Sequence, residues 1–306
     1  MTELKNKNIL ITGANGFVGL HLARYLKNKG ALVSVIIVDS KGIEDLKKIG
    51  VEIFICDLRN KPALDEVILK NNPQYIYHLA AIGSIPYSVK NPEETMHVNF
   101  LGTLNLLELI RNKNIKKFIY ISSAEIYQTN NLPVDENSNI EASSPYSASK
   151  IAADYLVSSY IATYNIPAVI FRPCNIYGVG NIKNVIYLFC KAALCGEDLN
   201  IEGGEQKKAF LYIDDFLSAL FLASDQEKFN GEIFNIGSKN FISILDLAKK
   251  IIKLTFSNSK INIKKLRNLG SKNLICNTKK VENLLDWQER TSLEEGLNNV
   301  INSLKE

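Results

Sequence analysis

Ser123, Tyr146 and Lys150 are residues of the types that together oxidise an alcohol. If a helix begins at Tyr146, Lys150 lies one turn later on the same face, close enough for its ammonium to act on the phenol. A free tyrosine has a pKa of about 10, and a neighbouring cation lowers that pKa toward the range of a working base. The Ser123 hydroxyl would then hold the substrate oxygen whose proton the phenolate takes. These side chains therefore predict oxidation of a secondary alcohol to a ketone, with the hydride passing to a cofactor.

Position distinguishes Tyr146 from two other tyrosines that are followed by a lysine four residues later, Tyr25 and Tyr187. A lysine-rich chain with 13 tyrosines is expected to contain about one such pair by chance. Tyr25 and Tyr187 lie within amphipathic helical patterns that no strand-end serine precedes, which indicates surface or packing positions. Tyr146 instead follows a buried-looking strand that ends in Ser122 and Ser123, so we assign the catalytic role to it.

Composition excludes several classes of protein. A chain of 306 residues with 46% hydrophobic and 22% charged residues is ordinary for a globular enzyme of one large or two modest domains. The net charge of +4 is small and its lysines are scattered, so we expect no nucleic-acid partner. No signal-peptide pattern and no apolar run of about 18 residues is present, so we expect a cytoplasmic protein without a membrane partner.

Cysteine and histidine usage predicts no metal. The five cysteines are odd in number and contain no C-x-x-C pair, which is typical of reduced thiols in a protein core. His21, His78 and His97 are isolated from one another, and we interpret them as structural or capping residues.

A glycine-rich turn near the start predicts a dinucleotide site. The apolar run 8–12 is followed by Gly13-Ala14-Asn15-Gly16-Phe17-Val18-Gly19 and then by a helix-period segment. Strand, glycine-rich turn and helix are the context in which the backbone approaches a pyrophosphate at a helix N-terminus. The spacing is G-x-x-G-x-x-G rather than the more common G-x-G-x-x-G.

The first half continues this rhythm. Near-continuous apolar strands are predicted at 32–38, 51–56, 75–79, 118–122 and 168–171, with helices between them, the clearest at 94–112 and 146–164. Such alternation implies a parallel sheet that helices cover on both faces. The predicted fold class is α/β, a doubly wound parallel sheet (Rossmann) with a smaller C-terminal substrate-binding domain.

Two acidic residues follow predicted strands. Asp39 would bond the adenosine ribose hydroxyls and favours NAD, because a carboxylate repels a 2′-phosphate. Ser40 and Lys41 could instead hold that phosphate, so NADP stays open. Asp57 is a candidate for the adenine, with a turn or helix cap as its alternative role.

Several spaced motifs resemble one family, the extended short-chain dehydrogenases that act on nucleotide sugars, and look most like UDP-glucose 4-epimerases. In the first half they are Gly13-x-x-Gly16-x-x-Gly19, Asp57-Leu58, His78-Leu79-Ala80-Ala81, Asn99, Ser122-Ser123, Tyr146-x-x-x-Lys150 and Arg172-Pro173-Cys174-Asn175-Ile176-Tyr177-Gly178. The residues 210–215, 234–237, 285–287 and 293–297 match the family's C-terminal half, so the resemblance runs nearly end to end.

The resemblance implies roles for individual residues. The cofactor, NAD, would be bound by Gly13, Asn15, Gly16, Phe17, Val18, Gly19, Asp39, Asp57, Leu58, Leu79, Ala80, Ala81, Asn99, Ser122, Tyr146 and Lys150. Lys150 would hold the nicotinamide ribose and tune Tyr146. The nucleotide-diphosphate sugar would be bound by Ser84, Ser123, Glu125, Asn175, Lys208 and Arg267.

The chain departs from the family pattern at three positions. The usual Arg-Asp pair is replaced by Lys208-Ala209, so one diphosphate contact would be a point charge rather than a planar fork. Gln128 occupies a position where glycine is usual. Ala124 occupies the position of the aspartate with which 4,6-dehydratases protonate the departing hydroxyl, which argues against dehydration.

Four reactions or roles are weighed. We favour a nucleotide-sugar 4-epimerase, because the residues 84–92 and Asn99 are similar to those of 4-epimerases. The alternative is an NAD(P)H-dependent reductase of a nucleotide-linked 4-keto-6-deoxy sugar, which residues 122–127 also resemble. Decarboxylation stays open because Glu125 is retained. A dinucleotide sensor without chemistry is disfavoured, because the Ser-Tyr-Lys set is kept.

The resemblance also predicts domain organisation and assembly. Residues 1–172 and 210–238 would form the dinucleotide-binding domain, and 173–209 and 239–306 the nucleotide-sugar-binding domain, with the substrate in the crevice between them. A homodimer is expected through the helices 94–112 and 146–164.

Overall fold

The structure is a computed structural model that describes residues 4–224, 226–265 and 273–305. The chain divides into two compact units. The first contains Met1–Gln128, Asn139–Arg172 and Leu217–Phe234, and the second contains Thr129–Ser138, Pro173–Phe216 and Asn235–Glu306. The predicted division after Arg172 coincides with a boundary between units, whereas the segments 129–138 and 210–216 lie in the second unit. The binding role of each unit stays a prediction.

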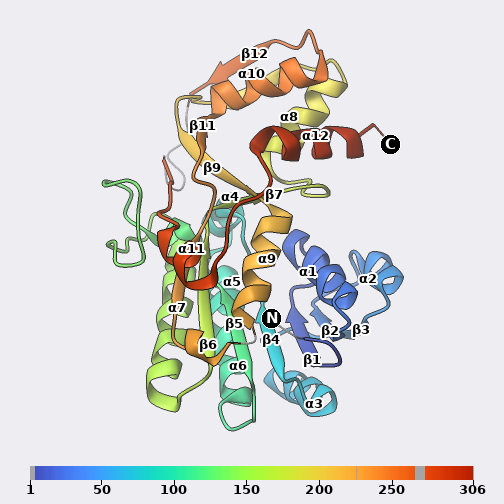
Figure 1. Cartoon of the computed structure of the whole chain (residues 1–306), viewed down its shortest axis with the longest axis vertical. Coiled ribbons are helices and arrows are strands. Elements are labelled where there is room, and N and C mark those ends of the chain that lie inside the picture. Colours follow the sequence, from blue (N-terminus) through green and yellow to red (C-terminus); the bar gives the residue numbers. More distant parts are fainter. Residues whose placement is uncertain (1–3, 225, 266–272, 306) are drawn as a thin grey trace. The chain divides into compact units, whose positions relative to one another are not determined.

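A seven-stranded sheet organises the first unit (Figure 1). Its spatial order is β10-β6-β5-β4-β1-β2-β3, and the strands β1 to β6 pair in parallel. Their bounds are β1 (Asn8–Thr12), β2 (Leu32–Ile37), β3 (Glu52–Ile55), β4 (Tyr75–His78), β5 (Lys117–Ile121), β6 (Ala168–Pro173) and β10 (Ile233–Ile236). The predicted doubly wound parallel sheet is confirmed, and the predicted strands agree to within one or two residues.

The strand order reverses between β1 and β4. The chain passes outward from β1 to β3 on one side and from β4 to β6 on the other. In doubly wound sheets, ligands bind outside the carboxyl ends of the strands at such a switch point. Gly13 follows β1 and Leu79 follows β4, so both predicted cofactor residues lie at this point.

Helices connect the strands of the first unit. They are α1 (Phe17–Asn28), α2 (Ile43–Ile49), α3 (Lys61–Asn71), α4 (Ile85–Lys90), α5 (Pro92–Met96), a π-helical turn (His97–Leu101), α6 (Gly102–Ile110), a 3₁₀ turn (Ala124–Ile126), α7 (Pro145–Tyr164), the end of α9 (Ile213–Ser224) and a 3₁₀ turn (Glu227–Phe229). The helix predicted at 94–112 is thus one run from Pro92 to Ile110 with a π-helical turn inside it.

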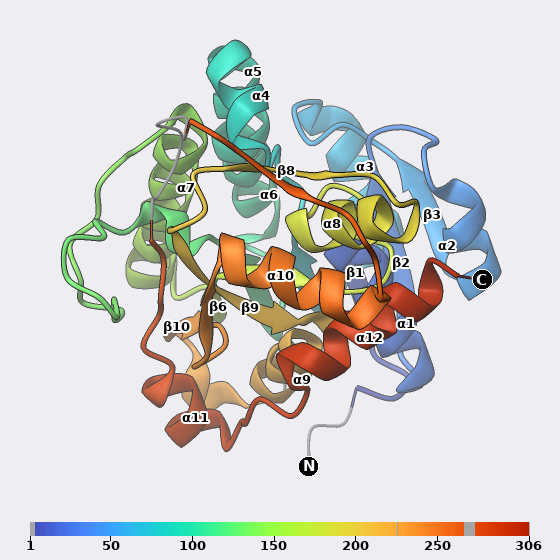
Figure 2. The same ribbon diagram turned by 90° about the horizontal axis from the view of Figure 1, so that it is seen from above.

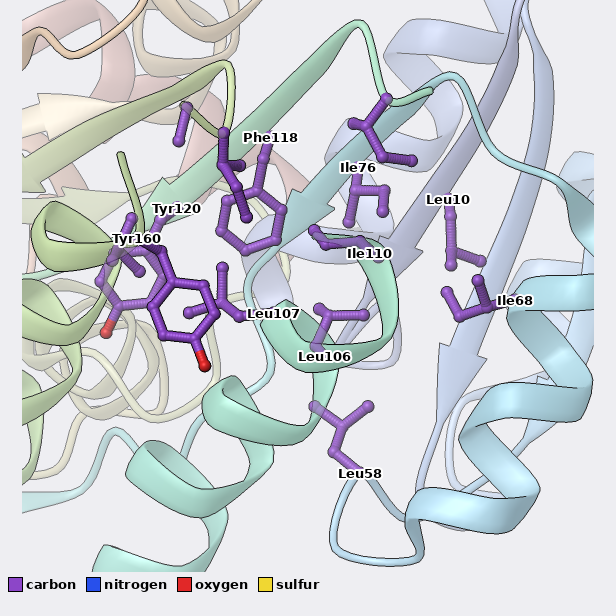
Figure 3. Packing of buried hydrophobic residues seen from close by; sticks show 14 of the residues in the cluster. Leu10, Leu58, Ile68, Ile76, Leu106, Leu107, Ile110, Phe118, Tyr120 and Tyr160 are labelled. Atoms are coloured by element: carbon purple, nitrogen blue, oxygen red, sulfur yellow. The ribbon is translucent and has the colours of Figure 1, made fainter. Parts of the chain in front are cut away.

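The main apolar cluster lies between the sheet and the helices α3, α6 and α7 (Figure 3). The strands contribute Leu10, Ile76, Phe118 and Tyr120, and α6 contributes Leu106, Leu107 and Ile110, all at most 2% exposed. The side chains from the strands and those from the helices pack against one another in one layer. This layer holds the end of β5 against α7, which are the two elements that carry the predicted catalytic residues.

A capping box fixes the start of α7. The Ser144 side chain accepts from the Ser147 amide at 3.1 Å, and the Ser147 hydroxyl accepts from the Ser144 amide at 2.9 Å. Pro145 occupies the first helical position, where its missing N–H costs nothing. The helix therefore begins where the sequence predicts, with Tyr146 and Lys150 one turn apart.

The described part of the second unit contains two small sheets, the start of α9, and the helices α8, α10, α11 and α12 (Figure 2). One sheet has the order β11-β9-β7, and the other pairs β12 with β8. The bounds are β7 (Asn175–Tyr177), α8 (Val185–Leu194), β8 (Leu199–Glu202), β9 (Lys207–Tyr212), β11 (Phe241–Ser243), α10 (Ile244–Thr255), β12 (Ile261–Lys264), α11 (Lys279–Leu285) and α12 (Leu293–Ser303). Residues 210–212 therefore belong to the small β9 sheet. Within the segment 210–238, which was assigned to the dinucleotide-binding domain, β10 pairs in the seven-stranded sheet, whereas residues 210–212 do not.

The described residues contain neither a candidate membrane span nor a candidate metal centre. None of the helices in the described ranges is both long and apolar enough to cross a membrane. No group of three or more histidine, cysteine or acidic side chains in the described part of the chain is arranged to hold a metal ion.

Candidate active site

Ser123 and Tyr146 meet at the carboxyl end of β5. Ser123 follows this strand and caps the short 3₁₀ turn, where its Oγ accepts from the Glu125 amide at 3.1 Å. The Ser123 side chain lowers the pKa of the Tyr146 phenol as a hydrogen-bond partner. The joint catalytic role of this strand-end serine and the tyrosine at the start of α7 stays a prediction.

Lys150 is buried one turn along α7. Its Nζ donates to the backbone oxygen of Ile121 at 2.5 Å and lies 4.5 Å from the centroid of the Tyr120 ring. Burial lowers the pKa of Lys150 to about 7, while the negative charge of Asp154 opposes that shift. The ammonium is therefore held by β5 and is easily deprotonated.

The pKa of Tyr146 lies above its ordinary value, which corrects the predicted direction. Burial raises the pKa, the hydrogen bond from Ser123 opposes this, and the charge of Glu125 raises the pKa further. The prediction assumed a fully charged lysine at the phenol. In the structure Lys150 is directed to the Ile121 oxygen, and its own burial disfavours the charge.

A buried ion pair supports α7 from β6. Arg172 donates to both carboxylate oxygens of Asp154 at 3.0 and 2.8 Å, and to the hydroxyl of Tyr127 at 2.8 Å. The Arg172 and Asp154 side chains are 4% and 1% exposed. Sequence reasoning missed this network, although Asp154 lies one turn after Lys150 and Arg172 belongs to a recognised motif.

Asn99 ties the π-helical turn to α7. Its amide oxygen accepts from the Ile82 amide at 2.7 Å, and its nitrogen donates to the Ile82 oxygen at 3.1 Å and to Ser149 Oγ at 2.9 Å. π-helical turns inside α-helices are often found at functional sites. The Asn99 side chain positions α7 and the loop after β4, and its contact with a cofactor stays a prediction.

A cavity of about 280 Å³ lies at the switch point of the sheet. Among the residues predicted to bind the cofactor, those that line it are Gly13, Asn15, Gly16, Asp57, Leu58, Leu79, Ala80 and Ala81. Phe17, Val18 and Gly19 lie on the first turn of α1, directly after the glycine-rich turn. The glycine-rich turn and the ends of β3 and β4 therefore converge on one site.

Glycine is required at two of these positions. A Cβ at Gly13, whose φ is +74°, would lie 2.7 Å from the Ala80 backbone. A Cβ at Gly19 would lie 2.4 Å from the Gly13 oxygen. The turn after β1 is thus packed directly on the loop after β4 and on its own helix. This cradle fits a dinucleotide pyrophosphate, which needs close backbone approach.

Ser122 provides a second observation that fits a bound group. Its Oγ is buried and has no hydrogen-bond partner among the described residues. Buried hydroxyls ordinarily have a partner. The residue precedes Ser123 at the end of β5, where the sequence predicts contact with the cofactor.

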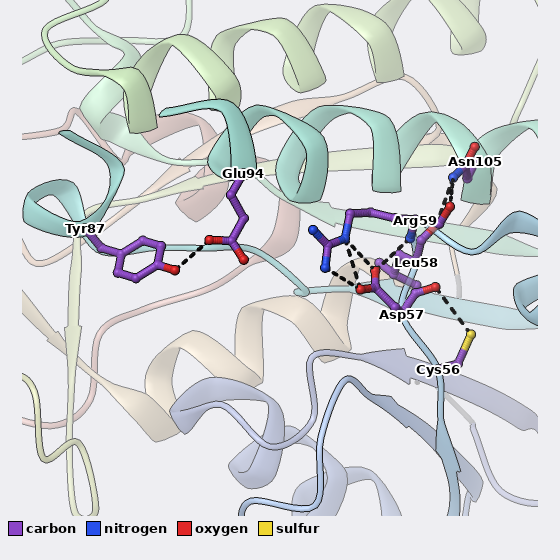
Figure 4. A network of polar contacts seen from close by, with 7 residues as sticks. All are labelled: Cys56, Asp57, Leu58, Arg59, Tyr87, Glu94 and Asn105. Carbon is purple, nitrogen blue, oxygen red and sulfur yellow. Dashed lines mark hydrogen bonds and ion pairs between the residues drawn. The ribbon is translucent and has the colours of Figure 1, made fainter. Parts of the chain in front are cut away.

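Arg59 holds the Asp57 carboxylate in the cavity wall (Figure 4). Its Nη2 lies 2.6 Å from Asp57 Oδ2, and its Nε lies 3.0 Å from both carboxylate oxygens. These hydrogen bonds lower the pKa of Asp57. Asn105 of α6 donates to the Leu58 oxygen at 2.9 Å and fixes the same segment. Sequence reasoning predicted Asp57 and Leu58 but missed Arg59, two residues further on.

Asp39 lies at the end of β2 beside the glycine-rich turn. Its Oδ1 accepts from Asn15 Nδ2 at 3.3 Å and from the Lys41 amide at 3.0 Å. Its carboxylate is thus joined to a residue of the cavity lining, which is compatible with the predicted ribose contact.

The predicted substrate residues are distributed over both units. In the first unit Ser84 caps α4 and accepts from the Tyr87 amide at 3.3 Å, and Glu125 follows Ser123. In the second unit Asn175 on β7 donates to the Ala209 oxygen at 3.0 Å. Lys208 on β9 lines a separate cavity of about 540 Å³. Arg267 lies outside the described residues.

Residues 9–237 match the model of the NAD dependent epimerase/dehydratase family. The chain is 36% identical over 272 residues to UDP-N-acetyl-alpha-D-glucosaminuronate decarboxylase of Bacillus cytotoxicus, covering 83% of this chain and 82% of that protein. It is 34% identical over 275 residues to dTDP-D-glucose 4,6-dehydratase of Dictyostelium discoideum, covering 83% of this chain but only 63% of that protein's length.

A solved structure is similar over nearly the whole chain. UDP-glucuronic acid 4-epimerase of Bacillus cereus, in complex with UDP-glucuronic acid and NAD, is 28% identical, has a TM-score of 0.90, and is matched over 97% of this chain and 98% of its own. This similarity and the family description support the predicted cofactor, NAD. Because the family model matches well over half of the residues, the chain belongs to the NAD dependent epimerase/dehydratase family.

Proposed function

We propose that the protein is a nucleotide-sugar 4-epimerase that oxidises C4 of its substrate transiently to a ketone. The observation that carries this proposal is the placement of Ser123 after β5 and of Tyr146 and Lys150 one turn apart on α7, where Lys150 donates to Ile121 at the end of the same strand. The apolar Ala124 follows Ser123. The set contains a base and an oxygen-holding hydroxyl. It supports removal of a proton from an alcohol and its return.

The chain's residues have distinct roles in this reaction. Ser123 holds the C4 oxygen, and the Tyr146 phenolate takes the hydroxyl proton. NAD, when bound along the glycine-rich turn and Asp57, would supply the hydride acceptor and donor. Tyr146 then returns the proton after the 4-keto sugar has turned to present its other face. The cycle leaves no net redox change.

Ala124 argues against dehydration in this chain. Elimination of a C6 hydroxyl needs an acid that protonates the leaving oxygen. Ala124 is fully buried and carries no ionisable group. A chain with this residue can form the 4-keto sugar but lacks that acid at this position.

Glu125 favours decarboxylation as a second candidate function. It is partly buried two residues after Ser123, and the relative from Bacillus cytotoxicus that is 36% identical is named as a decarboxylase. Oxidation of C4 in a hexuronic acid activates the neighbouring carboxylate for loss as carbon dioxide. The same Tyr146 and Ser123 would perform the first step of either reaction.

The test begins with the nucleotide that the denatured protein releases. Stoichiometric NAD, together with C4 epimerisation of UDP-glucose, UDP-N-acetylglucosamine or UDP-glucuronic acid seen by NMR, is the expected result. Release of carbon dioxide from UDP-glucuronic acid would select the decarboxylase. An empty site, with turnover only when NADPH and a 4-keto sugar are supplied, would replace the proposal with the reductase.

We also propose that the chain forms a homodimer through α7 and the run from Pro92 to Ile110. Apolar and aromatic side chains are exposed on these helices, with Leu101, Tyr155 and Tyr164 at 39%, 59% and 44%. Light scattering on the purified protein should give twice the chain mass, and the mass of a single chain would contradict the proposal.

A further inference from the structure

Two buried thiols meet in the second unit. Cys174 and Cys276 are separated by 102 residues in the chain, yet the Cys174 thiol donates to Cys276 with the sulfur atoms 2.6 Å apart. Non-bonded sulfur atoms ordinarily pack at a greater distance than this. The two side chains are 8% and 4% exposed.

Backbone hydrogen bonds hold both cysteines in place. The Cys174 amide donates to the Ile236 oxygen at 2.8 Å. On either side of Cys276, the Val134 amide donates to the Ile275 oxygen at 2.9 Å, and the Asn277 amide donates to the Val134 oxygen at 2.7 Å. These hydrogen bonds fix the backbone on which each thiol is carried, and thereby hold the two sulfur atoms close together.

Gly237 leaves the space in which Cys174 lies. A Cβ at this glycine would lie 3.0 Å from the Cβ of Cys174 and 3.1 Å from its sulfur. Contacts this short would push the Cys174 side chain aside. The glycine thus allows Cys174 to face Cys276.

A small molecule can reach the pair from one side. Cys276 lines a cavity of about 490 Å³ together with Pro133, Phe241 and Lys279. An oxidant as small as hydrogen peroxide fits such a cavity. The Cys190 thiol, by contrast, is fully buried, and burial raises its pKa to about 12, which keeps it protonated and unreactive.

We propose that Cys174 and Cys276 form a reversible dithiol–disulfide pair that responds to peroxide. One thiol loses its proton and its sulfur attacks an oxygen of hydrogen peroxide. The O–O bond breaks, a sulfenic acid forms, and the departing hydroxide takes up the proton and leaves as water. The sulfur of the second thiol then attacks the sulfenic sulfur, the S–S bond forms as the S–O bond breaks, and the hydroxide leaves with the second thiol's proton as another water. Two thiols are oxidised by two electrons in total, and one peroxide is reduced to two waters.

The disulfide would fasten a segment that packs on β9. Asn273 Oδ1 accepts from the Lys207 amide at 2.8 Å, and the Leu274 amide donates to the Lys207 oxygen at 3.4 Å. A bond from Cys276 to Cys174 would tie this segment to the residue before β7. The thiol chemistry does not depend on the activity proposed above, so the two are tested separately.

Peptide mapping of the folded wild-type protein tests the proposal. After peroxide treatment and alkylation of the remaining thiols, trypsin yields the peptides 151–183 and 273–279, each with one of the five cysteines. The expected product is these two peptides linked, two hydrogens lighter than their sum, and separated by dithiothreitol. Recovery of both peptides in alkylated, unlinked form would overturn the proposal.

Variants and hydrogen exchange add independent readouts. Cys195→Ser changes an exposed cysteine outside the pair and should retain the linked peptide, whereas Cys174→Ser and Cys276→Ser should each lose it. In the oxidised wild-type protein, amide exchange in 273–279 should slow by about tenfold, because a cross-link restricts local opening. Equal exchange rates in the oxidised and reduced proteins would contradict a fastened segment.

Discussion

The surroundings of Tyr146 raise the pKa of its phenol above that of a free tyrosine. Burial and the charge of Glu125 raise its pKa, and the hydrogen bond from Ser123 only partly opposes this. A base works in its deprotonated form, so a raised pKa moves the active form to higher pH. We therefore expect Ser123, which lowers the pKa of the phenol, to assist Tyr146 in acting as a base.

Replacing Tyr146 with phenylalanine removes the base and keeps the ring. We expect turnover in the epimerase assay to fall by about 10²–10⁴-fold, because this is the range that a positioned general base contributes. The matched control is Tyr187→Phe, a tyrosine on α8 that is also followed by a lysine four residues later, which should retain activity. Comparable activity in the two variants would remove Tyr146 from the mechanism.

The pH profile of the wild-type protein follows from the same pKa. Because the phenol of Tyr146 is harder to deprotonate than a free tyrosine, kcat/KM should rise with pH from 7 and continue to rise through pH 9. The measurement is the initial rate at limiting substrate across this range. A profile that is flat from pH 7 upward would mean that the phenolate is already formed at neutral pH.

Gly19 tests the dinucleotide cradle without touching the catalytic residues. An alanine Cβ there would lie 2.4 Å from the Gly13 oxygen and 2.7 Å from Ala14 Cα, so the turn must move. We expect Gly19→Ala to weaken NAD binding at least about tenfold, measured by calorimetry on the nucleotide-free protein. Gly83→Ala is the control, because a Cβ there meets no atom within 4 Å. Equal affinities in the two variants would contradict the cradle.

At the scale of elements, α7 carries the proposed catalytic residues and is bonded to the sheet through β6. Its first turn carries Tyr146, its second Lys150, and its third Asp154, which bonds Arg172 on β6. Because these residues lie one turn apart, a shift of the helix would displace all of them together. The buried ion pair therefore fixes the register of α7 against β6.

Replacing Asp154 with asparagine should leave the guanidinium of Arg172 buried without a full counter-charge. We expect the free energy of unfolding to fall by about 3–5 kcal/mol, which is typical for a broken buried ion pair. The control is Asp45→Asn, because Asp45 pairs with Lys48 on the surface of α2, where such pairs contribute at most about 1 kcal/mol. Urea denaturation of both variants makes the comparison, and similar losses would contradict the role of the buried pair.

Elements were predictable where local pattern decides them. The strand bounds and the glycine-rich turn follow from apolar runs and glycine spacing. The start of α7 was predicted from the helical pattern that begins at Tyr146, and the structure shows the capping box of Ser144 and Ser147 that fixes it. The π-helical turn at Asn99 did not follow, because it depends on hydrogen bonds to Ile82 and Ser149. Arg59 was also missed, because its role depends on how the segment after β3 folds back on Asp57.

At the scale of the whole molecule, the parallel sheet was predictable, since it follows from the alternation of strands and helices. The strand order that creates the switch point was not predicted. Contacts between residues that are far apart in the sequence could not be predicted. His78 reads as an isolated histidine, but its partners are 66 and 25 residues away, and Cys174 meets Cys276 over a separation of 102. No pattern within a short window encodes such pairs, because they form only when the sheet is assembled.

His78 joins three elements at the centre of the first unit. Thr103 donates to the Asn99 oxygen at 2.6 Å and therefore accepts from His78 Nε2 at 2.8 Å. Thr12 then donates to His78 Nδ1 at 2.7 Å. The ring is thus neutral, with its proton on Nε2 and both nitrogens satisfied. Burial and the charge of Lys150 lower its pKa to about 3.

The depressed pKa of His78 makes the stability of the protein depend on pH. An unfolded histidine titrates near 6.5 and the folded one near 3, so between these values the unfolded chain binds more protons and the free energy of unfolding falls with falling pH. From pH 6.5 to 5 this contribution is about 2 kcal/mol, at roughly 1.4 kcal/mol per pH unit. His78→Gln cannot take up this proton, so urea denaturation at pH 6.5 and 5 should give a loss smaller by that amount than in the wild-type protein. Parallel losses in the two proteins would mean that His78 is protonated in the folded state, which the hydrogen bonds to Thr12 and Thr103 argue against.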